Sequence, residues 1–117
     1  MSFKIVKKDS KLNARLGVLT TPHGEIHTPA FMPIGTKGAV KTLSSDEVKS
    51  LGAEVILANT YHLWISGDET IKKAEGLHKF MNWSGPIMTD SGGYQAFSLK
   101  PTLSEEGARF RDEISGA

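Results

Sequence analysis

The chain has 117 residues, 38% of them hydrophobic, which is enough for one small globular domain with its own core. The formal net charge of +1 neither favours nor excludes a nucleic-acid partner, and the absence of cysteine excludes disulfides, thiolate metal sites and cysteine nucleophiles within these residues. No apolar run is long enough to span a bilayer and the first residues do not begin a signal peptide, so we expect a cytoplasmic protein with no membrane partner.

The first part of the chain is predicted to form antiparallel β structure. Three short strands are expected, at residues 3–6, 15–19 and 25–27. The second and third flank a Thr-Pro-His-Gly sequence at 21–24, where proline in the second position and glycine in the fourth suit a type I turn. Residues 1–27 are therefore assigned to an antiparallel segment. Thr28-Pro29 then breaks the strand pairing, because proline has no N–H to donate.

From residue 28 onward, apolar runs alternate with amphipathic stretches. The apolar runs predict buried strands at 30–34, 55–58 and 87–89. The helices between them are expected to begin at the capping-box patterns 44–47 and 66–69, and to end or break at Gly52 and Gly76. This alternation predicts a parallel sheet with right-handed crossovers. After Phe97, we expect a loop over 98–104 and a hairpin with a polar turn over 105–111.

The stretch from Gly85 to Phe97 has the clearest pattern of a functional site. A predicted strand ends in Asp90, which is followed directly by Ser91, Gly92, Gly93 and Tyr94. The strand would fix the carboxylate, the glycines would let backbone N–H groups approach a ligand, and Tyr94 offers a flat face on which a base can stack. The alternative is that Asp90 only caps a Gly-Gly turn.

Two other segments are expected at the same edge of the sheet, because ligand sites of parallel sheets gather beyond the carboxyl ends of the strands. They are Gly35-Thr36-Lys37-Gly38 and Asn59-Thr60-Tyr61-His62. The convergence of three such segments favours the functional interpretation of Asp90.

Several other residues have an ordinary structural interpretation. Lys37 and Lys41 are placed where they could meet phosphate, although solvated surface charges are the simpler expectation. Trp64 and Trp83 are expected to pack in or beside the core. No metal site is predicted, because the spacing of the histidines does not match known ligand patterns; they are His23, His27, His62 and His78.

Four blocks of the sequence resemble the tRNA-guanine transglycosylase family, also called queuine tRNA-ribosyltransferase. They are TPAFMPIGT at 28–36, ANTYHL at 58–63, GLHKFM at 76–81 and TDSGGYQAFSL at 89–99. The blocks occur in the family's order and cover nearly the whole chain, and they are similar to the bacterial and eukaryotic branch. The sequence departs from the family pattern at Ile-Ser-Gly-Asp, 65–68, and at Asp-Glu-Ile, 112–114.

The resemblance implies an α/β fold, the N-terminal portion of a TIM (β/α)8 barrel preceded by a small antiparallel sheet. Residues 28–117 would then be the first three β/α units plus the start of an insertion. It implies a glycosyltransferase of tRNA processing and queuosine biosynthesis, which exchanges anticodon guanine for a 7-deazaguanine base (queuine or its precursor) through a covalent intermediate. Asp90 matches the family's proton acceptor and donor, and the substrate-binding residues are matched by Asp90, Ser91, Gly92, Gly93 and Tyr94.

Other features of the family would lie outside these residues. The resemblance implies a nucleophilic aspartate further along the chain, a zinc ion held by three cysteines and a histidine that this sequence does not contain, and a homodimer. A TIM barrel typically needs about 250 residues, so we expect this chain to be an N-terminal part that is inactive alone. There are two alternative functions. One is a non-catalytic RNA-binding partner subunit, against which the presence of Asp90 argues. The other is an unrelated barrel enzyme, against which the Asn59 and Asp90 blocks argue together.

Overall fold

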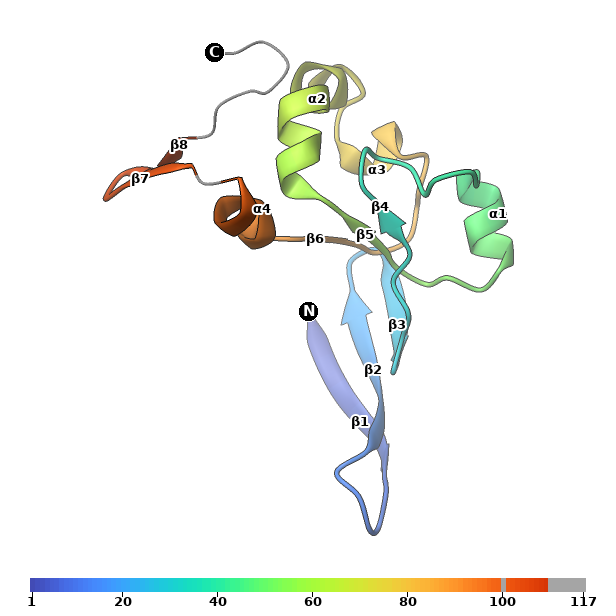
Figure 1. Ribbon diagram of the computed structural model, residues 1–117. Coiled ribbons are helices and arrows are strands. Elements are labelled where there is room, and N and C mark those ends of the chain that lie inside the picture. Colours follow the sequence, from blue (N-terminus) through green and yellow to red (C-terminus); the bar gives the residue numbers. More distant parts are fainter. Residues whose placement is uncertain (100, 110–117) are drawn as a thin grey trace.

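The protein is described here from a computed structural model, which covers residues 1–99 and 101–109. It is elongated, with extents of 54 × 33 × 25 Å. An antiparallel sheet projects from one side of a parallel sheet, and the helices gather around the parallel sheet (Figure 1). The predicted mixed α/β class with a small antiparallel sheet is confirmed.

The antiparallel sheet contains the three predicted N-terminal strands, in the order β1-β2-β3. They are β1 (Ser2–Lys8), β2 (Arg15–Thr21) and β3 (Gly24–Thr28). Gly24 closes the turn between β2 and β3 at a φ of 125°, a value that glycine adopts without a steric penalty. Every residue of β1 is exposed, and the sheet buries little beyond Gly17 and Ile26. Gly17 has no room for a Cβ because the ring of Phe3 covers it, so this glycine sets how closely β1 packs on β2.

The parallel sheet has the predicted second and third apolar runs as its central and edge strands. Its strands, in spatial order, are β4 (Ile34–Gly35), β5 (Ile56–Ala58) and β6 (Ile87–Thr89). Ile34 pairs with Leu57 and Ala58 pairs with Thr89, both in parallel register, which confirms the predicted strand direction.

The predicted buried strand at 30–34 is wrong over most of its length. Only Ile34 from that run joins the ladder, and Phe31 is 84% exposed. The physical reason is the pair of prolines, Pro29 and Pro33, which cannot donate to a neighbouring strand. The carbonyl of Pro33 still accepts a hydrogen bond of 2.9 Å from the N–H of Leu57, so the segment is tethered to β5 where pairing begins.

Four helices connect or follow these strands. They are α1 (Ser45–Ser50), α2 (Thr60–Lys73), α3 (Leu77–Phe80) and α4 (Gly93–Ser98). At α1 the predicted capping box is confirmed: the N–H of Glu47 donates to the hydroxyl of Ser44, and the N–H of Ser44 donates to the Glu47 carboxylate at 2.7 Å. The hydrogen bonds from Ser44, first from its N–H and then from its hydroxyl, lower the pKa of Glu47. Gly52 follows the helix at a φ of 85°, as expected for a C-terminal stop.

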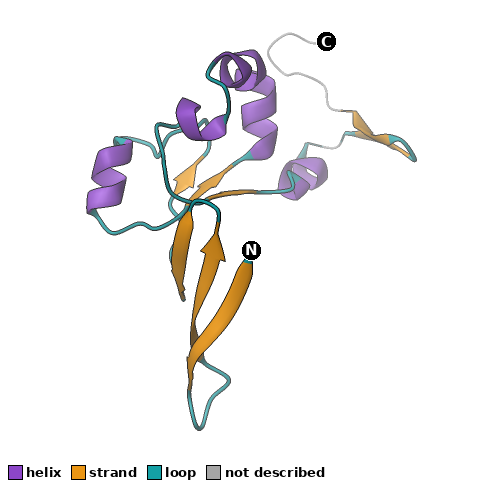
Figure 2. Ribbon diagram, turned by 180° about the vertical axis from the view of Figure 1, so that it is seen from behind, coloured by secondary structure: helices purple, strands orange, loops and turns teal. Residues whose placement is uncertain are grey.

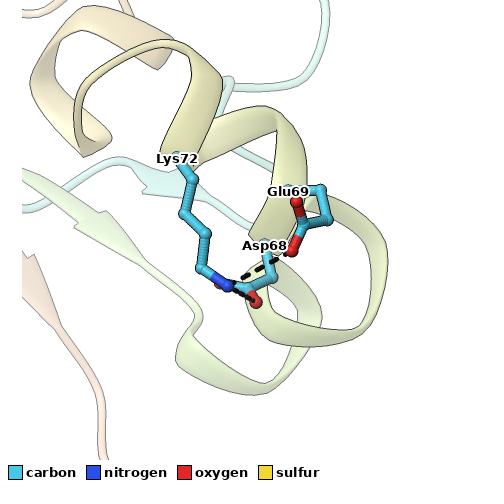
Figure 3. Close-up of polar contacts among 3 residues, drawn as sticks. All are labelled: Asp68, Glu69 and Lys72. Atoms are coloured by element: carbon cyan, nitrogen blue, oxygen red, sulfur yellow. Dashed lines mark hydrogen bonds and ion pairs between the residues drawn. The ribbon is translucent and has the colours of Figure 1, made fainter.

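The predicted start of the second helix at 66–69 is wrong, because α2 begins at Thr60 and runs through that segment. Asp68 and Glu69, expected in a first turn, lie inside the helix and both contact the Lys72 ammonium, at 2.7 and 3.3 Å (Figure 3). The Ser-x-x-Glu spacing at 66–69 fits a capping box. Acids three and four residues before Lys72 also fit ion pairs along a helix, so the same stretch matches both patterns. The predicted break at Gly76 is confirmed between α2 and α3.

The core lies between the parallel sheet and helices α1 to α3. Its buried members are Val48, Ile56, Ala58, Leu63, Met81 and Trp83. Trp83 is 4% exposed, and its indole N–H donates to the carbonyl of Pro86 at 3.0 Å, which satisfies its one polar atom. Trp64, by contrast, is 60% exposed and lies outside the core.

The antiparallel sheet projects away from the helices (Figure 2), and among the described residues a polar contact and a ring contact join it to the rest of the molecule. The Glu54 carboxylate accepts from the N–H of His27 at 2.6 Å and meets the His27 ring at 2.8 Å; the first of these contacts contributes most to a lowered pKa of Glu54. The ring of His23, in the β2–β3 turn, stacks on the ring of His78 in α3, with centroids 3.7 Å apart.

The last described part of the chain was only partly predicted. A hairpin is present, but its strands are β7 (Thr102–Ser104) and β8 (Gly107–Arg109), so it begins in the expected loop at 98–104. Phe110, Arg111 and the departure at 112–114 lie outside the described residues. Among the helices of the described part, none is long and apolar enough to cross a membrane.

Candidate functional site

Asn59 links the buried strand β5 to helix α2 and uses both halves of its side chain. Its backbone is extended, and its amide oxygen accepts from the N–H of His62 at 3.0 Å, which makes Asn59 the N-cap of α2. Its amide nitrogen donates to a carboxylate oxygen of Asp90 at 2.6 Å. Asn59 is 8% exposed, and both hydrogen bonds are partly buried.

Asp90 comes directly after β6 and reaches across to the start of α2. One carboxylate oxygen accepts from Asn59, and the other accepts from the N–H groups of Thr60 and Gly92, at 2.9 and 3.2 Å. The backbone of Asp90 is fixed too, because its N–H donates to the carbonyl of Ala58 and its carbonyl accepts from the Thr60 hydroxyl. The acid is therefore held from both sides at the carboxyl edge of the parallel sheet.

The Asp90 carboxylate also lies at the N-terminal end of a helix. Helix α2 has 14 residues and no acidic side chain in its own first turn. The Asp90 carboxylate lies against the first N–H of that helix, where the helix dipole stabilises an anion. The acid at the start of α2 therefore comes from Asp90, directly after β6, and not from the first turn of the helix itself. The alternative, in which Asp90 only caps its own turn, accounts for one of its three donors, the N–H of Gly92.

Ser91, Gly92 and Gly93 follow Asp90, and the turn they form differs from the prediction. Gly92 has a φ of 68°, in the left-handed region, and is the N-cap of α4. Gly93 is already the first residue of that short helix, which the sequence did not indicate. Ser91 and Gly93 are exposed, so backbone and hydroxyl groups here are accessible to a ligand.

Tyr94 lies in the first turn of α4 and is 77% exposed. Phe97, one turn later on the same helix, is 87% exposed. Two large aromatic side chains that remain in solvent beside a fixed carboxylate are available for contact with a flat ligand.

The third expected segment, Gly35 to Gly38, lies at the same edge but is packed against the protein. Gly35 and Gly38 are buried, and a Cβ at Gly38 would lie 2.3 Å from the ring of Phe80. Gly38 also has a φ of 81°, so the glycine is required by both space and backbone. Among the described residues, no hydrogen bond or ion pair joins Lys37 or Lys41 to Asp90, and the phosphate-binding hypothesis for these lysines stays a prediction.

Sequence reasoning missed how Asn59 and Thr60 hold Asp90. It placed both at the right edge of the sheet, but it placed the start of α2 too late. An asparagine directly after a buried apolar run is itself an N-cap signal. With Asn59 as the N-cap, the helix begins at Thr60, and its first N–H lies beside Asp90 at the end of β6.

Other cavities and side-chain groups do not add to this site. A mostly apolar hollow of about 680 Å³ lies between α1 and the segment around Phe31, and Asp90 does not line it. In the described part of the chain, no group of three or more histidine, aspartate or glutamate side chains could hold a metal ion. The zinc ligands that the resemblance implies are not supplied by these residues, and no step of the chemistry is assigned to a metal here.

The comparison with known proteins agrees with the resemblance. Residues 9–117 match the family model described as queuine tRNA-ribosyltransferase. Relatives with that name come from Desulforudis audaxviator, Desulforamulus reducens and Halalkalibacterium halodurans, and they are 56%, 56% and 54% identical to this chain. The matches cover 98%, 100% and 99% of this chain, and 32%, 32% and 31% of the respective relatives. The chain thus spans about a third of the length of these relatives. It belongs to the queuine tRNA-ribosyltransferase family.

Proposed function

We propose that the protein acts in the exchange of anticodon guanine in tRNA for a 7-deazaguanine base, queuine or its precursor. The observation that carries the proposal is the position of Asp90, fixed by Asn59, Thr60 and Gly92 at the carboxyl edge of a parallel sheet. Family membership supports the same conclusion, because the relatives are named for this transfer.

The chemistry suits the side chains at this edge. Cleavage of a glycosidic bond passes through an oxocarbenium-like state, and enzymes stabilise such states with pairs of carboxylates. In the proposal, a second aspartate outside these residues attacks the ribose, while Asp90 moves protons on the leaving and the incoming base. Tyr94 stacks on the base, with Ser91, Gly92 and Gly93 lining the binding loop. A covered base excludes water, so that exchange competes with hydrolysis.

The proposed architecture follows the same resemblance. β4, β5 and β6 would be the first three strands of a TIM barrel, with residues 1–27 as an antiparallel segment and 28–117 as the first β/α units plus the start of an insertion. A site at the carboxyl ends of barrel strands agrees with the place of Asp90. A homodimer, a cytoplasmic location and a structural zinc complete the proposal for the full-length protein. The zinc would need ligands other than these residues, which include no cysteine.

The test is base exchange by the full-length protein. We expect Asp90→Asn to lower the incorporation of labelled guanine into tRNA by at least about 100-fold, the usual contribution of a general acid or base. Asp46→Asn, on the exposed side of α1, is the matched control and should keep the parent rate. Thermal midpoints measured beside the rates separate a chemical loss from unfolding.

Two outcomes would overturn the proposal. Undiminished exchange by a folded Asp90→Asn variant would remove the proton-transfer role of Asp90. A parent protein that binds tRNA but exchanges no base would instead support the non-catalytic RNA-binding alternative.

A further inference from the structure

The loop end of the β1–β2 hairpin concentrates positive charge that nearby acids in the sequence do not balance. Five of the 14 lysines and arginines fall within the first 15 residues, against one of the 13 acids. Four of them lie around the turn of the hairpin; this group, named the hairpin tip, consists of Lys7, Lys8, Lys11 and Arg15. The tip is the part of the molecule farthest from helices α2 and α4 in both ribbon views (Figures 1 and 2).

The register of the hairpin places two of these cations directly opposite each other. Lys8 pairs with Arg15 across the antiparallel ladder. Like charges directly opposite each other destabilise a sheet, so this pair lowers the stability of the hairpin at this position. A local rule that is broken without a compensating contact is a sign of a functional surface.

The one acid at the tip does not neutralise these cations. Both the N–H of Lys11 and the N–H of Leu12 donate to the same carboxylate oxygen of Asp9, at 2.8 Å each, and these two bonds lower the pKa of Asp9. Within the described residues, no ion pair involves a cation of the tip. Lys72, in contrast, pairs with Asp68 on its own helix, and Lys79 pairs with Glu75 in the connection just before its helix.

The surface around the tip is hollowed and partly apolar. Lys8 and Arg15 line hollows of about 630 and 640 Å³, and Leu12 and Leu16, which each line one of them, are 71% and 51% exposed. Cations that flank shallow hollows can approach a curved polyanion from more than one side. The cations of the tip are on long, exposed side chains, which suit contact with phosphates better than the directed hydrogen bonds that reading a base requires.

We propose that the hairpin tip binds the phosphate backbone of tRNA, at a surface separate from the base-exchange site. The inference depends on the proposed function for its choice of polyanion, because the relatives of this chain are named for tRNA. The tip binds tRNA phosphates away from the base being exchanged, adding affinity without base specificity.

The experiment measures binding of a tRNA transcript to the full-length protein by fluorescence anisotropy, over a series of salt concentrations. The test variant is Lys7→Gln/Lys8→Gln/Lys11→Gln. The matched control removes three exposed positive charges elsewhere, Lys49→Gln/Lys73→Gln/Lys79→Gln. If each tip lysine contacts one phosphate, the slope of log K against log salt should fall by about 2 in magnitude, and affinity at about 0.1 M salt should fall about 100-fold.

The control variant should keep most of the parent affinity and slope. Base exchange at saturating tRNA should keep the parent kcat in the tip variant, with only KM raised, because the tip is separate from Asp90. Failure of the Asp90→Asn test would therefore remove the proposed reaction and leave the tip result standing, whereas unchanged tRNA binding by the tip variant would remove this inference alone.

Two further results would overturn the inference. One is an equal loss of tRNA affinity in the control and the tip variant, which would indicate a general charge effect. The other is a tip variant that binds tRNA normally but no longer binds phosphatidylserine vesicles, which would assign the surface to an anionic membrane.

Discussion

The antiparallel and the parallel sheet of this chain are stabilised in opposite ways. The antiparallel sheet has strands of five to seven residues and long ladders, with one register shift between Ile5 and Lys7, yet β1 is exposed along its whole length. The parallel sheet has strands of two or three residues, but Ile56 and Ala58 of its central strand are almost fully buried under the helices. Backbone pairing dominates the first, and side-chain packing dominates the second.

This difference shows where the molecule can fix a reactive group. Strands β5 and β6 are paired in parallel and end at the same edge, so the residues that follow them, Asn59 and Asp90, lie within hydrogen-bonding distance. Their side chains are then joined by a partly buried hydrogen bond, and such bonds are stronger and costlier to break than fully exposed ones. The exposed hairpin cannot hold a group in this way, but it offers a wide surface for contact with a partner.

The largest expected effect comes from removing a core side chain beside the parallel sheet. Trp83→Ala should lower the free energy of unfolding by about 3–5 kcal/mol, because it leaves a cavity and removes the indole hydrogen bond to the Pro86 carbonyl. Val6→Ala in β1, where the side chain is 63% exposed, should stay within about 0.5 kcal/mol of the parent. Urea denaturation of the full-length protein measures both, and comparable losses from the two variants would contradict the contrast between the sheets.

A smaller effect is expected at the link between β5 and β6. Asn59→Ala should cost about 1–3 kcal/mol, because it removes the N-cap of α2 and a hydrogen bond to Asp90 together. Asn59→Asp keeps an oxygen that can cap the helix but brings a second carboxylate against Asp90. It should therefore lose base-exchange activity more than Asn59→Ala does, although it preserves the cap. An Asn59→Asp protein with the parent's stability and activity would show that the contact with Asp90 is unimportant.

The sequence predicted best what local signals determine. The capping box at Ser44, the turn before Gly24 and the apolar runs ending at Ala58 and Thr89 each depend on a few neighbouring residues, and each was confirmed. The alternation of strands and helices then gave the parallel order without knowledge of any contact.

The errors arose where one pattern fits two structures or where distant residues decide. The apolar run at 30–34 has the composition of a strand, but the proline before it, Pro29, and the proline within it, Pro33, prevent pairing. The acids at 68 and 69 suit a helix start as well as an ion-pair ladder. The bond between Asn59 and Asp90 joins residues 31 positions apart, so only the placement of β5 beside β6 reveals it.

The smallest expected effect concerns the stacked rings of His23 and His78, which join the β2–β3 turn to α3. Burial of the His78 ring, and then the charge of His23 stacked against it, lower the pKa of His78 from 6.5; a backbone hydrogen bond with Gly85 acts in the opposite direction. The hollow beside His78 is also lined by Asp46, Lys49 and Lys79, so charges of both signs lie nearby.

The sign of the pH dependence follows from this lowered pKa. Below pH 6.5 the unfolded chain takes up a proton at His78 more readily than the folded protein does, so stability falls as the pH falls through 6.5 toward the folded-state pKa, and the contribution is fully present above 6.5. We expect His78→Gln to flatten this part of the stability profile between about pH 5 and 7, whereas His27→Gln, whose ring faces Glu54, should keep it. Urea midpoints across that range decide the matter. Parallel profiles for the parent and His78→Gln would show that the stacked pair does not couple hairpin docking to protonation, and that the two sheets are joined mainly through Glu54.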